Sequence, residues 1–396
     1  MNIRKQFVSV VLSVSAVLTM TGCNGAEEAV SDNLNPDYRV AMITNSGDIT
    51  DQSFNQTTYE ACAAYCEENA VAFTYKKPDG DTDYARAAMI DVAVAEGYNI
   101  IVMPGYTFAP VLIEATWKYP DVKFISLDMT AGNIIAAAVG DKYYADPDAY
   151  EVSDYYNTEN TYCAVYQEEI PGYMAGYAVV KLGYRKLGYL GGQAVPSVMR
   201  FGYGYIQGIN DAAEELGVED EISVEYAYGG QYYGSTEITA AMDTWCSKGT
   251  EVIFSCGGGI FTSAAEAASK VDAKLIGVDS DQAPIIDVYG EGMTITSAMK
   301  GLGATVRAML DSIIFTDTWE EHVGRIENLG LVSGTDLELN YVGLPEESTQ
   351  WNEHFTVEDY HEMVRQIYEG ELVIDSSIDH MPETVVEVNV REGSIM

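Results

Sequence analysis

Two similar series of short apolar segments, about 150 residues apart, restrict the fold of this chain more than any other feature of its sequence. The first series predicts strands at 38–44, 99–103 and 122–127. The second predicts strands at 186–190, 251–255 and 273–278. Helical stretches separate the strands, at 53–69, 84–96, 110–118, 201–216 and 236–247. Short apolar strands that alternate with helices form parallel βαβ units, so the sequence predicts an α/β protein with two similar lobes.

The residues that follow the predicted strands indicate where a ligand binds. In parallel α/β lobes, ligands bind outside the carboxyl ends of the strands. These ends carry six small or polar residues: Asn45, Gly105, Asp128, Gly192, Gly257 and Asp279. Two lobes whose strand ends face each other form a cleft that closes on a small ligand by hinge motion. The pattern therefore predicts a two-lobed binding protein.

The first 23 residues have the pattern of a secretory signal. Arg4 and Lys5 precede a mostly apolar run over 7–20, which is too short to span a hydrocarbon core of roughly 30 Å. The residues MTGC at its end resemble a bacterial lipobox, whose cysteine is lipidated after cleavage. We expect a lipoprotein signal peptide over 1–23, a lipid on Cys23 and a tether over 24–37. The alternative is an ordinary signal peptide with a chance cysteine.

The charge of the chain excludes several classes of partner. Its 396 residues include 21 Lys and Arg against 61 Asp and Glu, which gives a formal charge of −40. Such a surface repels phosphate backbones and anionic headgroups, so we expect no nucleic-acid binding and no polybasic membrane contact. Five cysteines follow the signal. Their odd number and irregular spacing do not fit a disulfide framework, so we interpret them as small apolar residues of the core: Cys62, Cys66, Cys163, Cys246 and Cys256.

The segment after the first predicted strand carries candidate ligand contacts. Ser53 followed by Gln56 is a capping-box pattern and predicts a helix start. Phe54 and Asn55 then lie in the first helical turn, beside the strand end. An aromatic ring there can stack on a planar ligand, and an amide can bind its polar edge. The alternative is that Phe54 is a hydrophobic staple and Asn55 an exposed residue.

Asp279 and Lys300 suggest a second kind of contact. A carboxylate at a strand end, with a lysine after the next short β-type run, suits vicinal hydroxyls. Each hydroxyl can donate to the carboxylate and accept from the ammonium. The alternative is a structural salt bridge between the two side chains.

No sequence motif indicates catalysis or a cofactor. The glycines at 257–259 belong to no phosphate-binding motif, and the chain has no nucleophile-elbow, metalloprotease or Cys/His metal pattern. Glycine at 257 lets a ligand approach the backbone closely. We therefore expect no enzyme activity, no cofactor and no metal site.

Several segments of the chain resemble the basic membrane protein family, lipid-anchored solute-binding proteins of ABC transporters, many of which bind purine nucleosides. The resemblance covers about residues 38–375. Its motifs are found at 40–56 (VAMITNSGDITDQSFNQ), 100–105, 119–128 (YPDVKFISLD), 168–176 (EEIPGYMAG), 277–282 (GVDSDQ) and 297–300 (SAMK).

The resemblance implies a type I periplasmic-binding-protein fold of two Rossmann-like lobes, with a ligand cleft and crossing hinge strands. By its motifs Phe54 stacks on a base and Asn55 contacts the ligand, while Asp128 supplies an acid. Asp279 and Lys300 then hold the ribose. A second stacking aromatic falls at Tyr232 or at its neighbour Tyr233.

The chain departs from the family pattern at Asn45, where the family usually carries an acid. An acid accepts hydrogen bonds only, whereas an amide both donates and accepts. The departure leaves open which base is bound, or whether the ligand is of another class.

The resemblance also implies domain boundaries. The N-terminal lobe is expected over 38–165 with about 300–330, and the C-terminal lobe over 166–299 with about 331–396.

Taken together, the sequence predicts an extracytoplasmic, lipid-anchored and monomeric receptor of an ABC importer for nucleosides, purine nucleosides first. Its partners are a membrane permease and an ATPase. Three alternatives remain: a receptor for riboflavin or another planar heterocycle, a nucleoside-hydrolysing enzyme with Asp128 or Asp279 as general base, and a surface adhesin.

Overall fold

The computed structural model describes residues 35–45 and 47–396. The proposed signal peptide, the lipidation site Cys23 and most of the tether lie outside the described residues. Within the described part of the chain, no helix is both long enough and apolar enough to cross a membrane.

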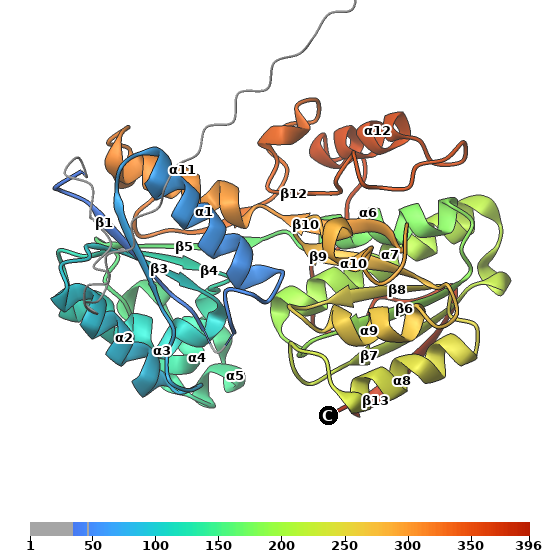
Figure 1. Cartoon of the computed structure of the whole chain (residues 1–396), viewed down its shortest axis with the longest axis horizontal. Helices are drawn as coiled ribbons and strands as arrows, with labels where there is room; N and C mark the ends of the chain where they lie inside the picture. Colours follow the sequence, from blue (N-terminus) through green and yellow to red (C-terminus); the bar gives the residue numbers. More distant parts are fainter. Residues whose placement is uncertain (1–34, 46) are drawn as a thin grey trace, which may run out of the picture. The chain divides into compact units, whose positions relative to one another are not determined.

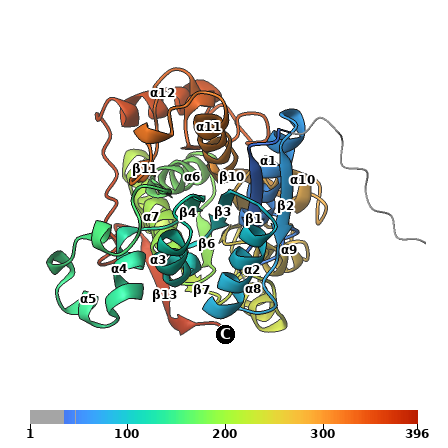
Figure 2. The same cartoon turned by 90° about the vertical axis from the view of Figure 1, so that its left-hand side faces the viewer.

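The first sheet has six strands, all parallel, in the order β11-β5-β4-β3-β1-β2. Its strands are β1 (Arg39–Ile43), β2 (Ala72–Lys76), β3 (Ile100–Pro104), β4 (Lys123–Leu127), β5 (Thr161–Tyr166) and β11 (Ile326–Leu329). The helices of this part of the chain are α1 (Phe54–Glu68), α2 (Asp83–Ala95), α3 (Ala109–Lys118), α4 (Ala131–Val139), α5 (Lys142–Ala145) and α11 (Leu302–Ile314). Figure 2 shows the short helix α5 beyond the end of α4.

The second sheet has seven strands, in the order β12-β10-β9-β8-β6-β7-β13, and only β12 runs antiparallel to its neighbour. Its strands are β6 (Lys186–Gly191), β7 (Ser223–Tyr228), β8 (Val252–Cys256), β9 (Lys274–Asp279), β10 (Thr294–Lys300), β12 (Val342–Gly343) and β13 (Glu387–Ser394). The accompanying helices are α6 (Glu169–Lys181), α7 (Pro196–Leu216), α8 (Thr236–Ser247), α9 (Phe261–Ala268), α10 (Ala283–Ile286) and α12 (Val357–Tyr368).

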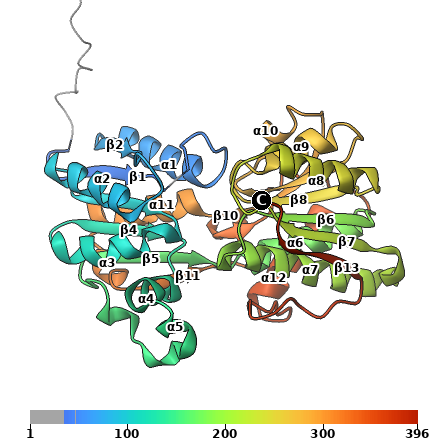
Figure 3. The same cartoon turned by 90° about the horizontal axis from the view of Figure 1, so that it is seen from below.

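Both sheets are covered by helices on both faces, which explains why their strands are nearly continuous apolar runs. In β1, Val40 and Met42 face the core that α1 and α11 build, whereas Ala41 and Ile43 face the core of α2 and α3. Figure 1 shows these two helical layers around the first sheet. Around the second sheet, α8 and α9 cover one face and α6 and α7 the other (Figure 3).

The chain passes between the two sheets three times, after β5, after β10 and after β11. These crossings are hydrogen-bonded to one another, since Gly301 N–H donates to the Tyr341 carbonyl at 2.6 Å and Gln167 N–H to the Leu329 carbonyl at 2.9 Å. Gly330 is pressed against the Gln167 side chain, where a Cβ would have no room. Three closely packed crossings give the two lobes a defined hinge.

All six strands predicted from the repeat are observed, with ends that differ by at most one residue. The helix predicted over 201–216 is the exception among the helices, because it begins five residues earlier, at Pro196. Proline is well tolerated in the first turn of a helix, since its missing N–H would have no intrahelical partner there. The predicted start of this helix at residue 201 was wrong, because the proline at its true start does not break the helix.

Candidate functional site

The residues at the strand ends gather into one region between the sheets. Asn45, Gly105 and Asp128 follow β1, β3 and β4, which are neighbours in the first sheet. Asp128 and Asp279 both adopt left-handed backbone conformations, with φ of 53° and 68°. Non-glycine residues rarely adopt such angles, and those that do are concentrated at functional sites. Corresponding positions of the two repeats thus have the same unusual backbone.

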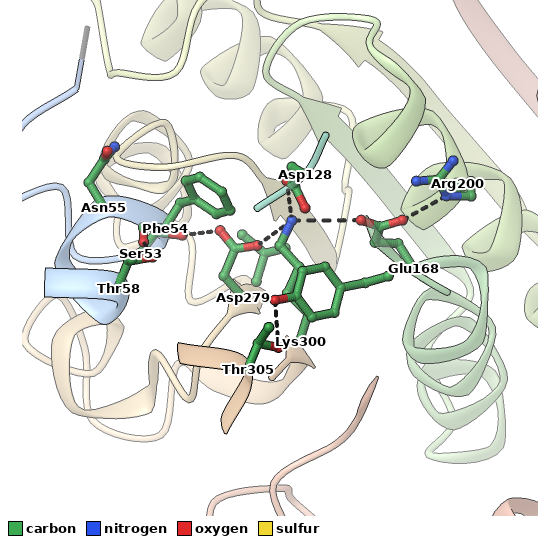
Figure 4. Close-up of polar contacts among 12 residues, drawn as sticks. Ser53, Phe54, Asn55, Thr58, Asp128, Glu168, Arg200, Asp279, Lys300 and Thr305 are labelled. Carbon is green, nitrogen blue, oxygen red and sulfur yellow. Dashed lines mark hydrogen bonds and ion pairs between the residues drawn. The ribbon is translucent and has the colours of Figure 1, made fainter. Parts of the chain in front are cut away.

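A cluster of buried charges surrounds Lys300, the last residue of β10. Its Nζ lies 2.6 Å from Asp128 Oδ2, 3.6 Å from Asp279 Oδ1 and 3.7 Å from Glu168 Oε1, and its side chain is 3% exposed. Figure 4 shows the three carboxylates around this ammonium. Because Asp128 belongs to the first lobe and Lys300 to the second sheet, this ion pair joins the two lobes.

Aromatic rings enclose the same ammonium. The Nζ of Lys300 lies 4.8 Å from the ring centre of Phe54, 5.5 Å from that of Tyr166 and 5.9 Å from that of Phe201. Such contacts stabilise a cation by about 0.5–2 kcal/mol each when it is shielded from water. Phe54 is half-buried and lies at the start of α1, as the sequence predicted.

The start of α1 differs from the predicted capping box. Ser53 makes no cap with its side chain, and its hydroxyl donates instead to Asp279 Oδ2 at 2.5 Å. The carboxylate of Asp51 caps the helix, because it accepts from the backbone N–H groups of Ser53, Asn55 and Gln56 at 2.9–3.0 Å. A carboxylate is favoured at a helix N-terminus, and here it leaves the Ser53 hydroxyl available to link the lobes.

Two amides lie beside Phe54. Asn45 Oδ1 accepts from the Gly47 N–H at 2.6 Å, and Asn45 Nδ2 donates to the Pro104 carbonyl at 3.3 Å. Asn55 Nδ2 donates to Asp51 at 2.8 Å, while Asn55 Oδ1 is buried and has no hydrogen-bond partner among the described residues. The pair therefore offers one N–H of Asn45 and the oxygen of Asn55 to a neighbouring group.

On the opposite lobe, Tyr232 packs against the glycines at the strand ends. A Cβ at Gly192 or at Gly257 would lie 2.5 Å or 2.9 Å from its ring, so a larger residue at either position would displace Tyr232. Tyr232 is half-buried and lies near Tyr106 of the first lobe, whose hydroxyl donates to Gln193 Oε1 at 2.9 Å. Its neighbour Tyr233 is 66% exposed. Of the two tyrosines, Tyr232 is the one that lies at the site.

The site also contains charged residues that the sequence analysis did not single out. Glu168 is fully buried at the crossing that follows β5, and its Oε2 accepts from Arg200 Nε at 2.6 Å. Arg200 lies on α7, and Glu169 Oε2 is 3.8 Å from the same nitrogen. One signal could have found the acids, since Glu168 and Glu169 lie at the start of a helix that is otherwise almost wholly apolar.

Burial and the neighbouring charges together set the pKa values of these groups. Burial raises the pKa of Asp279, which Lys300 and Ser53 oppose, and it raises the pKa of Glu169 to about 7. Burial alone would lower the pKa of Lys300, but the carboxylates of Asp128, Asp279 and Glu168 raise it above its usual range. Lys300 is therefore a permanent cation.

The site thus combines half-buried aromatic rings from both lobes with amides, carboxylates and one ammonium. This composition suits a planar, neutral ligand that carries hydroxyl groups.

Comparison with protein families gives one match over most of the chain. A family model described as "Bmp: ABC transporter substrate-binding protein PnrA-like" matches residues 38–377. Similar proteins include the ABC transporter nucleoside-binding protein BmpA of Lactococcus lactis subsp. cremoris, which is 21% identical over 78% of this chain and 84% of that protein. Basic membrane protein A2 of Borrelia garinii subsp. bavariensis is 26% identical over 75% of this chain and 78% of that protein.

Solved structures show the same architecture. The solute-binding protein of an ABC transporter system from Aeropyrum pernix K1 aligns with a TM-score of 0.61 at 20% identity, over 85% of this chain and 87% of that one. A corresponding protein from Conexibacter woesei DSM 14684 also gives 0.61 at 20% identity, over 86% and 99%. The chain has the type I fold of periplasmic solute-binding proteins, as the sequence predicted.

Proposed function

We propose, from the premise that this chain belongs to the Bmp family of PnrA-like ABC transporter substrate-binding proteins, that its cleft binds nucleosides, purine nucleosides first. The observation that carries the proposal is the shortage of donors around Lys300. Three carboxylates surround one ammonium, and Asp128 Oδ1 and Glu168 Oε1 are buried without hydrogen-bond partners among the described residues. Buried acceptors of this kind require donors, and a nucleoside supplies them through its ribose hydroxyls and the N–H groups of its base.

In this proposal Asp279, Lys300 and Ser53 form the sugar subsite. A carboxylate beside an ammonium binds each hydroxyl of a diol from both sides, because a hydroxyl donates and accepts. A structural salt bridge would need no third partner, and Lys300 is closer to Asp128 than to Asp279. Asp279 Oδ2 is held by the Ser53 hydroxyl, while Asp279 Oδ1 lies 3.6 Å from Lys300 and is the oxygen that we assign to the ligand.

Phe54 and Tyr232 form the base subsite, one from each lobe. Their rings stack on the two faces of a base, and the amides of Asn45 and Asn55 bind its edge. Gly257 keeps the second lobe close to the ligand, because a larger residue would displace Tyr232. The relative from Lactococcus lactis is named a nucleoside-binding protein, which supports this class of ligand.

We further propose that the protein is a monomer held at the outer face of the cell membrane through a lipid on Cys23. There it passes its ligand to the permease of an importer whose ATPase drives transport. A relative from Pyrococcus furiosus, 22% identical over 83% of this chain and 76% of that protein, is named a lipoprotein.

The substitution Asp279→Asn tests the sugar subsite. Asparagine tolerates the left-handed backbone at this position, so the variant is expected to fold. Titration calorimetry should show that inosine binds about ten- to a hundredfold more weakly, whereas the weaker binding of hypoxanthine, which has no ribose, is nearly unchanged.

The matched control is Asp220→Asn, at an exposed position. This variant should bind inosine and hypoxanthine as the wild type does. Equal losses for inosine and hypoxanthine in the Asp279 variant would contradict the assignment of this residue to the ribose.

A further inference from the structure

Arg200 carries hydrogen-bond donors that no residue of the site uses. Its Nε is held by Glu168 at 2.6 Å, as Figure 4 shows, and its side chain is 16% exposed. Among the described residues, neither Nη nitrogen of Arg200 has a hydrogen-bond partner. A guanidinium that is fixed at Nε and unpaired at Nη is a preorganised donor fork.

The guanidinium borders a small cavity. The cavity has roughly the size of one water molecule. Its lining includes Tyr106, Asp128 and Arg200. Asp128 belongs to the same lining, and its Oδ1 is buried without a hydrogen-bond partner in the described part of the chain. A residue with an unpaired donor and a residue with an unpaired acceptor thus line the same cavity.

These two groups restrict what enters the cavity. The carboxylate of Asp128 repels a phosphate, and the guanidinium of Arg200 repels a cation. A neutral group with an acceptor next to a donor satisfies both residues. The size of the cavity fits a single exocyclic atom and not a ring.

The cavity lies next to the proposed base subsite. Tyr106 lines it and interacts with Tyr232, while Asp128 is bonded to Lys300, whose Nζ lies over Phe54. A base that stacks on Phe54 and Tyr232 therefore presents one edge to Asp128 and Arg200.

We propose that Arg200 is a specificity-determining residue that, with Asp128, binds the lactam edge of a 6-oxopurine nucleoside. The inference rests on the proposed function. The ring N–H donates to Asp128 Oδ1, and the exocyclic oxygen enters the cavity and accepts from Arg200. Inosine and guanosine then bind more tightly than adenosine, because adenine has an amino donor in place of the oxygen and an unprotonated ring nitrogen in place of the N–H. Both hydrogen bonds are reversed in adenosine.

Calorimetric titrations with inosine, adenosine, purine riboside and 1-methylinosine test the proposal. Purine riboside lacks both the exocyclic oxygen and the ring N–H, whereas 1-methylinosine lacks the ring N–H alone. For the wild-type protein we expect inosine to bind at least about ten- to a hundredfold more tightly than each of the other three, since 1-methylinosine loses one of the two charge-assisted hydrogen bonds and the other two nucleosides lose both.

The variant Arg200→Lys keeps the positive charge beside Glu168 and removes the donor fork. It should lose about tenfold or more in affinity for inosine and little for purine riboside, with a melting temperature close to that of the wild type. Arg307→Lys is the matched control, since Arg307 pairs with Glu68 on the surface and its side chain is 41% exposed. This control should leave every affinity unchanged.

Different results would overturn the proposed function and the role of Arg200. If wild-type protein binds no nucleoside, the proposed function is overturned, and the inference with it. If nucleosides bind but adenosine matches inosine, or Arg200→Lys weakens all of them equally, the inference alone is overturned. The wild-type series decides the question by itself if the variant does not fold.

Discussion

Glu169 gives the protein a pH-dependent stability that one substitution should remove. This glutamate begins α6, is 5% exposed, and its Oε2 has no hydrogen-bond partner among the described residues. Burial, and next to it the charge of Glu168, raises its pKa from 4.5 to about 7, while Arg200 opposes the shift. The folded protein therefore holds a proton that the unfolded chain releases.

The sign follows from proton linkage. Between pH 4.5 and pH 7 the folded state binds more protons at this group than the unfolded state, so stability falls as the pH rises. The contribution is fully present below pH 4.5 and is lost above pH 7. A shift of this size corresponds to about 3 kcal/mol. Glu169→Gln keeps the shape of the side chain and removes the titration.

Urea denaturation at pH 5 and at pH 8 measures the effect. The free energy of unfolding of Glu169→Gln, relative to the wild type, should rise by about 2–3 kcal/mol from pH 5 to pH 8. Glu214→Gln, at an exposed position of α7, serves as the control and should follow the wild type at both pH values. If the Glu169 variant shows the same pH dependence as the wild type, the buried carboxyl is not the cause and the reasoning fails.

Three further predictions concern the ligand subsites and the anchor. Phe54→Ala should weaken nucleosides and free bases alike, by about 1–3 kcal/mol in calorimetry, since it removes stacking on the base; a loss confined to nucleosides would contradict this. Tyr232→Ala should weaken both ligands similarly, whereas substitution of the exposed Tyr233 should leave binding unchanged, and the reverse result would show that the wrong tyrosine was assigned. Cys23→Ala should release the protein from the membrane fraction or block its processing; a variant that is processed normally and stays with the membrane would rule out lipidation at this residue.

The architecture was predictable because parallel strands covered on both faces leave a strong signal in the sequence. The run from Val40 to Ile43 is wholly buried and apolar, and it ends at a polar residue on the edge of the sheet. The same signal recurs in both lobes, so the strand ends, and with them Asp128 and Asp279, could be assigned to one region. The strand β13 gave no such signal, because it lies at the edge of its sheet and its side chains are mostly exposed.

The partners of individual polar groups were less predictable. Ser53 fits a capping box by spacing, but Asp51 competes for the same backbone N–H groups and, as a carboxylate, caps the helix more strongly. Local spacing cannot reveal that Asp279, 226 residues away in the chain, accepts from the Ser53 hydroxyl. Likewise Arg200 reaches Glu168 only because α6 and α7 pack together, which no short motif encodes.

That the five cysteines form no disulfide framework was predictable from their number and spacing alone. All of them are free and buried within the described residues, as expected of small apolar fillers. Burial raises the pKa of the Cys66 thiol to about 12, so this residue stays protonated and unreactive at neutral pH.

The most direct test of the central claim is a calorimetric titration of the mature protein with inosine, guanosine and adenosine, after unfolding and refolding to remove any ligand that purified with it. The account predicts saturable binding of one nucleoside per chain, and no comparable heat with ribose alone or with inosine monophosphate. If no purine nucleoside binds at millimolar concentration, the assignment of this cleft to nucleosides is wrong.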